Sequence, residues 1–261
     1  MNLLLFKDER LAYTLPSSDE RYHYLRNSLG AELGGMVAIG VVNQRRGLAK
    51  VTRMDEKAID LVPVWEGSPP PKPAPIEGLL GLPRPQTARR ILYDAASLGI
   101  ARLHFFRAEK TSPGYAMSKL WLSGEWLRRL EEGAQQGYST WIPDVVHHRN
   151  LEEALDSLEL ADGNQGRSLV ALDPYEGRLP LGKLEGFEGS TLFLALGPEG
   201  GWSAAERSVM HGVGARFAHL GGRILRCETA FVAGLALVQS WMGGMDDPAG
   251  CTLEPNLEAL R

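Results

Sequence analysis

Cysteine is scarce in this chain, which holds only Cys227 and Cys251 among its 261 residues. Two isolated cysteines indicate neither a disulfide framework nor a metal site. No apolar run approaches the roughly 18 to 20 residues that a membrane-spanning helix needs. The first ten residues lack the basic start and long apolar core of a signal peptide. We therefore expect a cytoplasmic protein with reduced thiols, and neither a membrane nor a metal as partner.

A strong excess of charge of one sign is also missing, since the formal net charge is -4. The charge is unevenly distributed, because residues 1–135 hold 19 basic and 15 acidic residues while residues 136–261 hold 9 and 17. A half that is basic relative to its neighbour is compatible with polyanion binding. Chance variation in surface charge is the alternative explanation.

Prolines are concentrated in one segment, residues 67–75, where five of the nine residues are proline. Such a segment can be neither a helix nor a central strand, so we expect an extended linker. It separates a small domain at 1–66 from a larger one at 76–245, which a tail at 246–261 follows. The 44% hydrophobic and 23% charged composition is ordinary for globular domains.

The first domain has the pattern of a small β structure. Short β-branched runs at 36–42, 48–53 and 58–64 predict strands, separated by turn-like segments. A short helix is expected at 19–27, opened by a cap within Ser17–Glu20. Such a small set of strands predicts a compact barrel.

The second domain alternates between strand and helix patterns, which predicts a parallel α/β sheet with helices on its faces. The expected strands lie at 76–82, 100–106, 142–146, 168–172, 191–196 and 216–220. The expected helices lie at 87–98, 116–136, 151–158, from 203 onward and at 228–241. The adjacent His147 and His148 are expected in a loop, and the six histidines show no metal-ligand spacing.

Two glycine-rich segments, 191–203 and 217–230, interrupt this alternation. Each is an apolar run that is broken by glycines and followed by a helix-like stretch. Glycines let the backbone approach a ligand closely, and a helix N-terminus offers free N–H groups. Because parallel strands end at the same sheet edge, the two segments predict neighbouring loops around a small-molecule site.

The segments Leu196-Gly-Pro-Glu-Gly-Gly-Trp-Ser203, followed by Glu206, and Leu220–Ala230 together resemble the two signature motifs of the RsmE-type RNA methyltransferases. His23–Arg26 and Ala95–Gly99 extend the resemblance over most of the chain. The resemblance implies a SPOUT-class catalytic domain with a trefoil knot, preceded by a PUA-like β-barrel. It also implies a homodimer that uses S-adenosylmethionine to methylate N3 of a uridine in 16S rRNA or the small ribosomal subunit.

The same motifs imply the site residues. Arg226 is expected to be catalytic, orienting the uracil carbonyls or stabilising negative charge on N3; a salt bridge with Glu228 or Glu199 is the alternative. Glu199 is expected to hold the loop backbone, and Thr229 to cap the last helix or bind the ligand. For the leucines, ordinary core packing is the alternative role. The expected cofactor-binding residues are Leu172, Leu196, Gly197, Glu199, Gly201, Leu220, Gly221, Ile224, Leu225, Thr229 and Ala230.

The segments expected on the RNA side depart from the family. A Lys/Glu-rich segment is replaced by Pro83–Arg90, a Ser-Glu-Arg-like segment by Arg107–Lys110, and Ala134–Tyr138 lacks the arginine of a Glu-Gln-x-x-Arg motif. Basic side chains in these regions position phosphates or are solvated surface charges. The expected RNA-binding residues are Arg21, Arg26, Arg84, Arg89, Arg107 and Lys110, with Arg45, Arg46, Arg53 and Arg90 as further candidates.

Two other functions compete with this interpretation. The missing arginine near Tyr138 suggests a ribosome-binding protein that keeps the fold without catalysis. Gly197–Gly201 could instead form an anion nest for a nucleotide. The nucleotide enzyme is disfavoured, because neither glycine-rich phosphate-binding pattern is present. No residue is identified as a general base.

Overall fold

The structure is a computed structural model that describes residues 2–66, 72–160, 166–184 and 191–246. The described chain forms two compact units, one of residues up to 72 with 134–142, the other of 73–133 with 143–246. The part of the chain that the structure describes contains no candidate membrane-spanning helix. Most of the expected linker, at 67–71, and the expected tail from 247 onward lie outside the described residues.

The first unit contains a five-stranded sheet in the order β1-β3-β4-β5-β2. Its strands are β1 Leu4–Phe6, β2 Tyr13–Pro16, β3 Met36–Val41, β4 Arg46–Met54 and β5 Ala58–Trp65. β1 pairs with β3 in parallel, and the other neighbours are antiparallel. The three expected strands are confirmed. β1 and β2 were not predicted, because runs of three or four residues carry too little periodicity.

The edge strands of this sheet meet through their side chains. The rings of Phe6 on β1 and Tyr13 on β2 stack with centroids 3.8 Å apart. Leu15, Ile39 and Ile59 are buried in the same cluster. The sheet therefore encloses its own apolar core.

A short helix covers this core, as the sequence predicts. α1 (Glu20–His23) continues as the π-helical turn η1 (Tyr24–Leu29). The carboxylate of Asp19 caps α1 by accepting a 2.9 Å hydrogen bond from the N–H of Arg21. Leu25 is fully buried beneath the helix.

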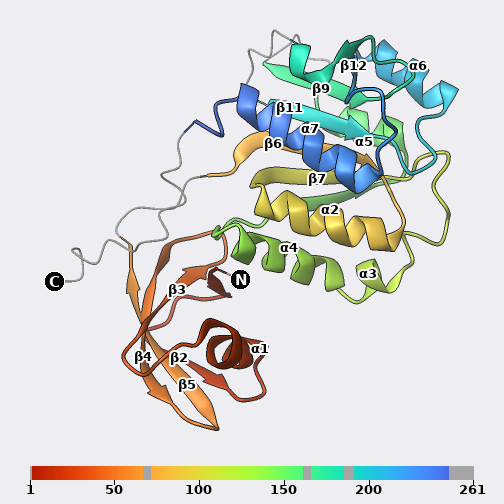
Figure 1. Cartoon of the computed structure of the whole chain (residues 1–261). Coiled ribbons are helices and arrows are strands. Elements are labelled where there is room, and N and C mark those ends of the chain that lie inside the picture. The colour runs from red at the N-terminus through yellow and green to blue at the C-terminus, as the bar shows by residue number, and fades with distance from the viewer. Residues whose placement is uncertain (1, 67–71, 161–165, 185–190, 247–261) are drawn as a thin grey trace. The chain divides into compact units, whose positions relative to one another are not determined.

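The second unit is built on a seven-stranded parallel sheet in the order β10-β12-β9-β11-β6-β7-β8 (Figure 1). Its strands are β6 Ala74–Gly81, β7 Ile100–Phe106, β8 Asp144–His148, β9 Arg167–Leu172, β10 Leu179–Pro180, β11 Thr191–Leu196 and β12 Arg216–His219. The parallel α/β sheet is confirmed. Only the two-residue edge strand β10 was not predicted.

Helices cover both faces of this sheet. They are α2 Pro85–Ser97, α3 Lys119–Leu122, α4 Glu125–Gln136, α5 Leu151–Ser157, α6 Ala204–Gly212 and α7 Cys227–Trp241, with a 3-10 turn η2 at Leu181–Lys183. α2 and α7 lie side by side on one face (Figure 1), while α5 and α6 pack against the other. A Cβ on Gly234 of α7 would lie 2.9 Å from Leu172, so α7 packs closely on β9.

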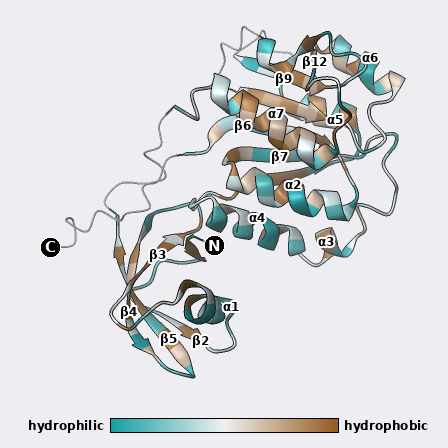
Figure 2. Ribbon diagram, in the orientation of Figure 1, coloured by the Kyte–Doolittle hydropathy of each residue, from teal (hydrophilic) through white to brown (hydrophobic). Residues whose placement is uncertain are grey.

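The colouring in Figure 2 follows this layering. β11 is hydrophobic along its length, whereas α4 carries many hydrophilic residues. Phe193, Leu194 and Ala195 of β11 are accordingly buried. A central strand that is covered on both faces reads as a continuous apolar run, which is why the sequence revealed it.

Three local predictions are wrong. The single helix expected at 116–136 is two helices, because Gly124 adopts a left-handed φ of +74° and ends the first. Residues 74 and 75 belong to β6 rather than to the linker. The register of β6 and β7 shifts between Ala74 and Glu77, so Pro75 has no paired residue on β7. Proline is tolerated at such a position because it has no N–H to donate to the ladder.

The pair His147 and His148 lies in β8, not in a loop. The strand starts after Pro143, because proline cannot donate to a sheet ladder, and it ends at His148, two residues beyond the predicted end. Nε2 of His148 lies 3.0 Å from Nδ1 of the buried His104 on the neighbouring strand β7. Nε2 of His104 lies 2.7 Å from a carboxylate oxygen of Glu77 on β6. Side-chain contacts that link three strands therefore hold His148 in the sheet.

Candidate functional site

Three loops at one edge of the parallel sheet line a cavity of about 190 Å³. They follow β9, β11 and β12, and the N-terminal turn of α7 contributes Cys227 and Ala230. The two glycine-rich segments are therefore neighbours at the same sheet edge, as the sequence predicts. Every expected cofactor-binding residue except Thr229 lines this cavity. The side chain of Thr229 is exposed on α7.

Glycine is required at two positions of the loop after β11. A Cβ on Gly197 would lie 2.9 Å from the backbone nitrogen of Trp202, closer than a Cβ can approach. Gly201 has a left-handed φ of +68°, and its N–H donates a 2.7 Å hydrogen bond to the carbonyl of Pro198. The loop therefore forms a tight turn whose backbone lies against the cavity.

The buried side chain of Trp202 anchors this loop to the sheet. Its side chain is 1% exposed and stacks on Phe106, with ring centroids 5.9 Å apart. Its indole nitrogen donates a 3.0 Å hydrogen bond to the carbonyl of Leu172 at the end of β9. Immediately after it, Ser203 and Glu206 form a reciprocal capping box that starts α6.

One wall of the cavity is polar, and its residues were not predicted from the sequence. The carboxylate of Asp173 is 1% exposed and accepts hydrogen bonds from Nε of Arg207 at 2.6 Å and from the N–H of Tyr175 at 2.9 Å. The bond to Asp173 raises the pKa of Arg207. All three residues line the cavity. A carboxylate directly after a buried strand is a usable signal for Asp173, whereas nothing in the sequence distinguishes Arg207 from other helix arginines.

Cys227 places a thiol on the cavity wall. Its Sγ lies 3.7 Å from the carbonyl oxygen of Gly197. Burial raises the pKa of this thiol to about 11, with a smaller contribution from Glu199. The neutral thiol is therefore a weak donor to the loop rather than a nucleophile. Cys251 lies outside the described residues.

Arg226 lies at the N-cap position of α7, and its side chain is exposed. It is not among the residues that line the cavity. Within the described residues its guanidinium makes no ion pair, since Glu228 pairs with Arg90 at 2.8 Å and Glu199 lies 3.7 Å from Arg84. The alternative salt bridge is therefore not formed, and the guanidinium is available to a substrate.

The sequence predicts that Glu199 holds the backbone of its own loop, but its carboxylate holds a neighbouring loop instead. Its carboxylate accepts a 3.1 Å hydrogen bond from the N–H of Arg84, just after β6. Nε of Arg84 donates in turn to the hydroxyl of Thr87 at 3.1 Å. Glu199 therefore joins the loops that follow β6 and β11.

The other basic candidates of this unit differ in their engagement. Arg89 donates two hydrogen bonds to Glu125, at 2.7 and 2.9 Å, and holds the pKa of that carboxyl at about 2. The ammonium of Lys110 donates to two backbone carbonyls. Arg107 is exposed, and its side chain has no partner within the described residues. Arg107 is thus the candidate in this group whose guanidinium stays free within the described part of the chain.

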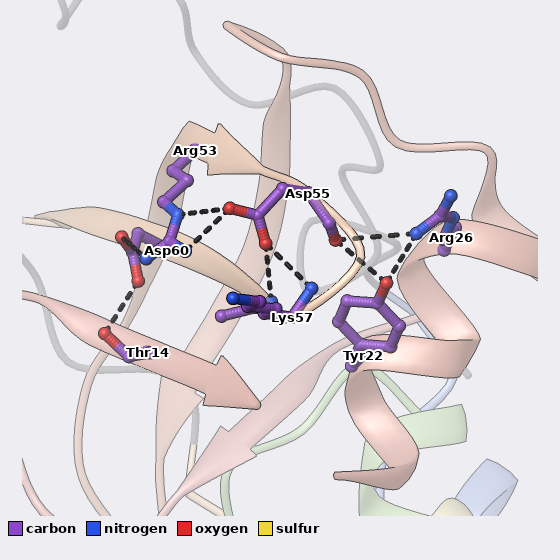
Figure 3. A network of polar contacts seen from close by, with 8 residues as sticks. Thr14, Tyr22, Arg26, Arg53, Asp55, Lys57 and Asp60 are labelled. Carbon is purple, nitrogen blue, oxygen red and sulfur yellow. Dashed lines mark hydrogen bonds and ion pairs between the residues drawn. The ribbon is translucent and has the colours of Figure 1, made fainter. Parts of the chain in front are cut away.

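In the first unit, the arginine candidates take part in internal polar contacts (Figure 3). Arg26 donates to the hydroxyl of Tyr22 and the carbonyl of Asp55, and Arg53 forms a 2.6 Å ion pair with the Asp55 carboxylate. The N–H groups of Lys57 and the next residue, together with Arg53, hold the pKa of Asp55 at about 2. Asp55 therefore links the β4–β5 turn to α1.

Three further candidates lie in the same unit. Arg21 pairs with Asp19 and donates to the carbonyl of Leu5 at 3.0 Å. Arg45 pairs with Glu9 at 3.1 Å. Arg46 is 9% exposed and donates to the carbonyl of Tyr138 at 3.3 Å. Burial leaves Arg46 little surface for a phosphate, unlike Arg21 and Arg45.

Comparison with known proteins identifies the family. A family model described as an RNA methyltransferase domain matches residues 70–239. The chain is 29% identical to ribosomal RNA small subunit methyltransferase E of Treponema pallidum over 91% of this chain and 90% of that protein. The structure of the Neisseria gonorrhoeae enzyme of the same name, bound to S-adenosylmethionine, has a TM-score of 0.73 at 18% identity, covering 92% of this chain and 98% of that one.

A second solved structure, a Legionella pneumophila protein in complex with S-adenosylmethionine, has a TM-score of 0.71 at 19% identity. It covers 92% of this chain and 97% of its own. These likenesses show that the fold is shared over nearly the whole chain. Because the family match covers more than half of the sequence, the chain belongs to the family of RNA methyltransferase domains.

Proposed function

We propose that this protein is an S-adenosylmethionine-dependent methyltransferase that modifies N3 of a uridine in 16S rRNA. The observation that carries the proposal is the cavity at the sheet edge, which both glycine-rich motifs line together. The names of the relatives support a ribosomal RNA substrate, and the ligands of two structural neighbours support the cofactor.

The residues around the cavity fit the cofactor. Leu172, Leu196 and Leu225 offer an apolar slot for adenine, while the backbone at Gly197 can approach the ligand closely. The ion pair between Asp173 and Arg207 provides polar groups for the ribose or the amino acid part. S-adenosylmethionine supplies the methyl group on a positively charged sulfur.

The protein contributes position and charge to the transfer. The nucleophile must approach in line with the bond that breaks, so orientation supplies much of the catalysis. N3 of uracil must lose its proton to solvent for the attack, and the negative charge of the deprotonated ring spreads over the ring carbonyls until N3 takes the methyl group. The free guanidinium of Arg226, next to the cavity-lining Leu225 and Cys227, is positioned to stabilise that charge.

The finer architecture belongs to the same proposal. We infer that the first unit is a PUA-like barrel, which the contact between Phe6 and Tyr13 supports, and that the segments around the cavity form a trefoil knot. We also propose a cytoplasmic homodimer whose interface includes the exposed side of α7. RNA is expected to contact Arg21, Arg26, Arg84, Arg89 and Arg107, while specificity comes from base contacts and shape.

Nucleoside mass spectrometry of 16S rRNA from cells that lack the gene tests this function. We expect 3-methyluridine to disappear and to return when the wild-type gene is restored. An Arg226→Ala gene should restore little of it. Persistence of 3-methyluridine at the wild-type level refutes the proposed target. RNA binding without any methyl transfer by the purified protein would favour the non-catalytic ribosome-binding alternative.

A further inference from the structure

The loop after β7 holds the glycine loop of the cavity in place. Nζ of Lys110 donates 3.0 Å hydrogen bonds to the carbonyl oxygens of both Gly200 and Trp202. These two carbonyls flank Gly201, the left-handed residue of the turn. One ammonium group therefore holds a backbone carbonyl before and a backbone carbonyl after the position where the loop reverses direction.

The stem of Lys110 also packs on this loop. A Cβ added to Gly200 would lie 3.1 Å from Cβ and Cδ of Lys110, so the side chain runs along the loop backbone. Gly200, Gly201 and Trp202 all line the cavity. The cavity wall is thus supported from outside by a residue that does not line it.

Neighbouring contacts fix the position of Lys110 itself. The N–H of Glu109 donates a 2.9 Å hydrogen bond to Oε1 of Glu206, whose other oxygen closes the capping box of α6. The hydroxyl of Thr111 donates to the carbonyl of Leu82 at the end of β6, at 3.1 Å. The segment around Lys110 is therefore anchored to the first turn of α6 and to the residue that follows β6.

The geometry points to a role for Lys110 in cofactor binding rather than in RNA binding, an inference that rests on the proposed function. We propose that Lys110 is a positioning residue that holds Gly200–Trp202 in the conformation that lines the cofactor cavity. A lysine ammonium has three donors, and two of them are used here on backbone carbonyls. Without them, the two carbonyls turn to water and the loop samples conformations that do not bind the cofactor.

Three variants separate the two roles. Lys110→Met removes the hydrogen-bond donors and keeps most of the aliphatic length of the side chain. Lys119→Met is the matched control on an exposed lysine of α3. Arg107→Met removes a free cation three residues before Lys110. Affinity for S-adenosylmethionine is measured by calorimetry, and affinity for a 16S rRNA fragment by filter binding. Thermal denaturation of each full-length variant checks that it is folded.

We expect Lys110→Met to weaken S-adenosylmethionine binding by about tenfold, the effect of losing one or two charge-assisted hydrogen bonds. Its affinity for RNA should stay close to that of the wild type. Lys110→Arg should recover part of the cofactor affinity, because guanidinium also donates to carbonyls. Arg107→Met should weaken RNA binding alone, and Lys119→Met should change neither affinity.

The opposite pattern overturns the assignment: cofactor binding by Lys110→Met equal to that of the wild type, with RNA binding lost. If Lys110→Met does not fold, Gly200→Ala provides a second test, since its new Cβ presses on the Lys110 stem and should also weaken cofactor binding. Unchanged cofactor affinity in Gly200→Ala would then reject the role. A wild-type protein that binds no S-adenosylmethionine refutes the proposed function instead.

Discussion

The indole nitrogen of Trp202 donates a 3.0 Å hydrogen bond to the carbonyl of Leu172, and this bond ties the first glycine loop to the end of β9. Both groups are buried, so loss of the donor leaves a carbonyl without a partner or water. We expect Trp202→Phe to lower the free energy of unfolding by about 1 to 3 kcal/mol. Urea denaturation measures this change. Trp126→Phe on α4, where the ring is half-buried, is the control and should have a much smaller effect.

The ion pair between Asp173 and Arg207 allows a test by double substitution. Arg207→Met leaves a carboxylate that is 1% exposed without its cation. We expect a loss of about 3 kcal/mol in the free energy of unfolding, the usual result of breaking a buried pair. Adding Asp173→Asn should recover part of this loss, because the uncompensated charge is removed. Stability of Arg207→Met equal to that of the wild type would show that the pair contributes nothing, and equal stability of the single and double variants would show that the uncompensated charge is not the cause of the loss.

Gly197 and Gly212 form a matched pair for testing the cavity loop. An alanine Cβ at Gly197 collides with the Trp202 backbone, whereas one at Gly212 in α6 meets open space. We expect Gly197→Ala to weaken S-adenosylmethionine binding by about tenfold or more, since the loop must distort. Gly212→Ala should leave binding unchanged. Calorimetric titration measures both, and similar affinities for the two variants would exclude a constrained loop.

The pH dependence of stability should reflect His148. Burial, and next the nearby His104, lower the pKa of His148 below its ordinary value of 6.5, while Glu153 opposes this shift. Below pH 6.5 an unfolded chain takes up a proton that native His148 resists, so stability falls as the pH decreases through this region. We expect His148→Gln to show a smaller fall, measured by urea unfolding at several pH values. An unchanged slope would contradict this.

Cys227 should react slowly with alkylating reagents. Its pKa of about 11 leaves little thiolate at neutral pH, and the thiolate is the reactive form. In a Cys251→Ser background, we expect iodoacetamide modification to remain slow up to pH 9 and then to accelerate, followed by mass spectrometry. Rapid modification at pH 7 would show that the thiol is neither buried nor held near Gly197.

The sheet of the second unit could be predicted from sequence because its strands are covered on both faces. Continuous apolar runs such as 192–196 and 169–172 leave little ambiguity. The cavity could be located because its glycines directly follow two of the expected strands, 191–196 and 216–220. The break at Gly124 was missed, since apolar spacing persists on both sides of it and the left-handed φ is not visible in the pattern.

Side-chain partners were the least predictable part of the site. Lys110 and Arg107 look alike in the sequence, and both are exposed, yet Lys110 donates to two backbone carbonyls whereas the Arg107 side chain has no partner within the described residues. The ion pair between Arg207 and Asp173 joins residues 34 positions apart, and the two side chains meet only because of how α6 packs beside β9. Such contacts follow from tertiary geometry, which single-residue patterns do not encode.

The most direct test of the account is calorimetric titration of the purified full-length protein with S-adenosylmethionine. We expect saturable binding that Gly197→Ala strongly weakens and that Arg226→Ala, outside the cavity lining, leaves nearly unchanged. Absence of binding by the wild-type protein, together with no increase in its thermal stability when the ligand is present, would refute the proposal that this protein uses S-adenosylmethionine.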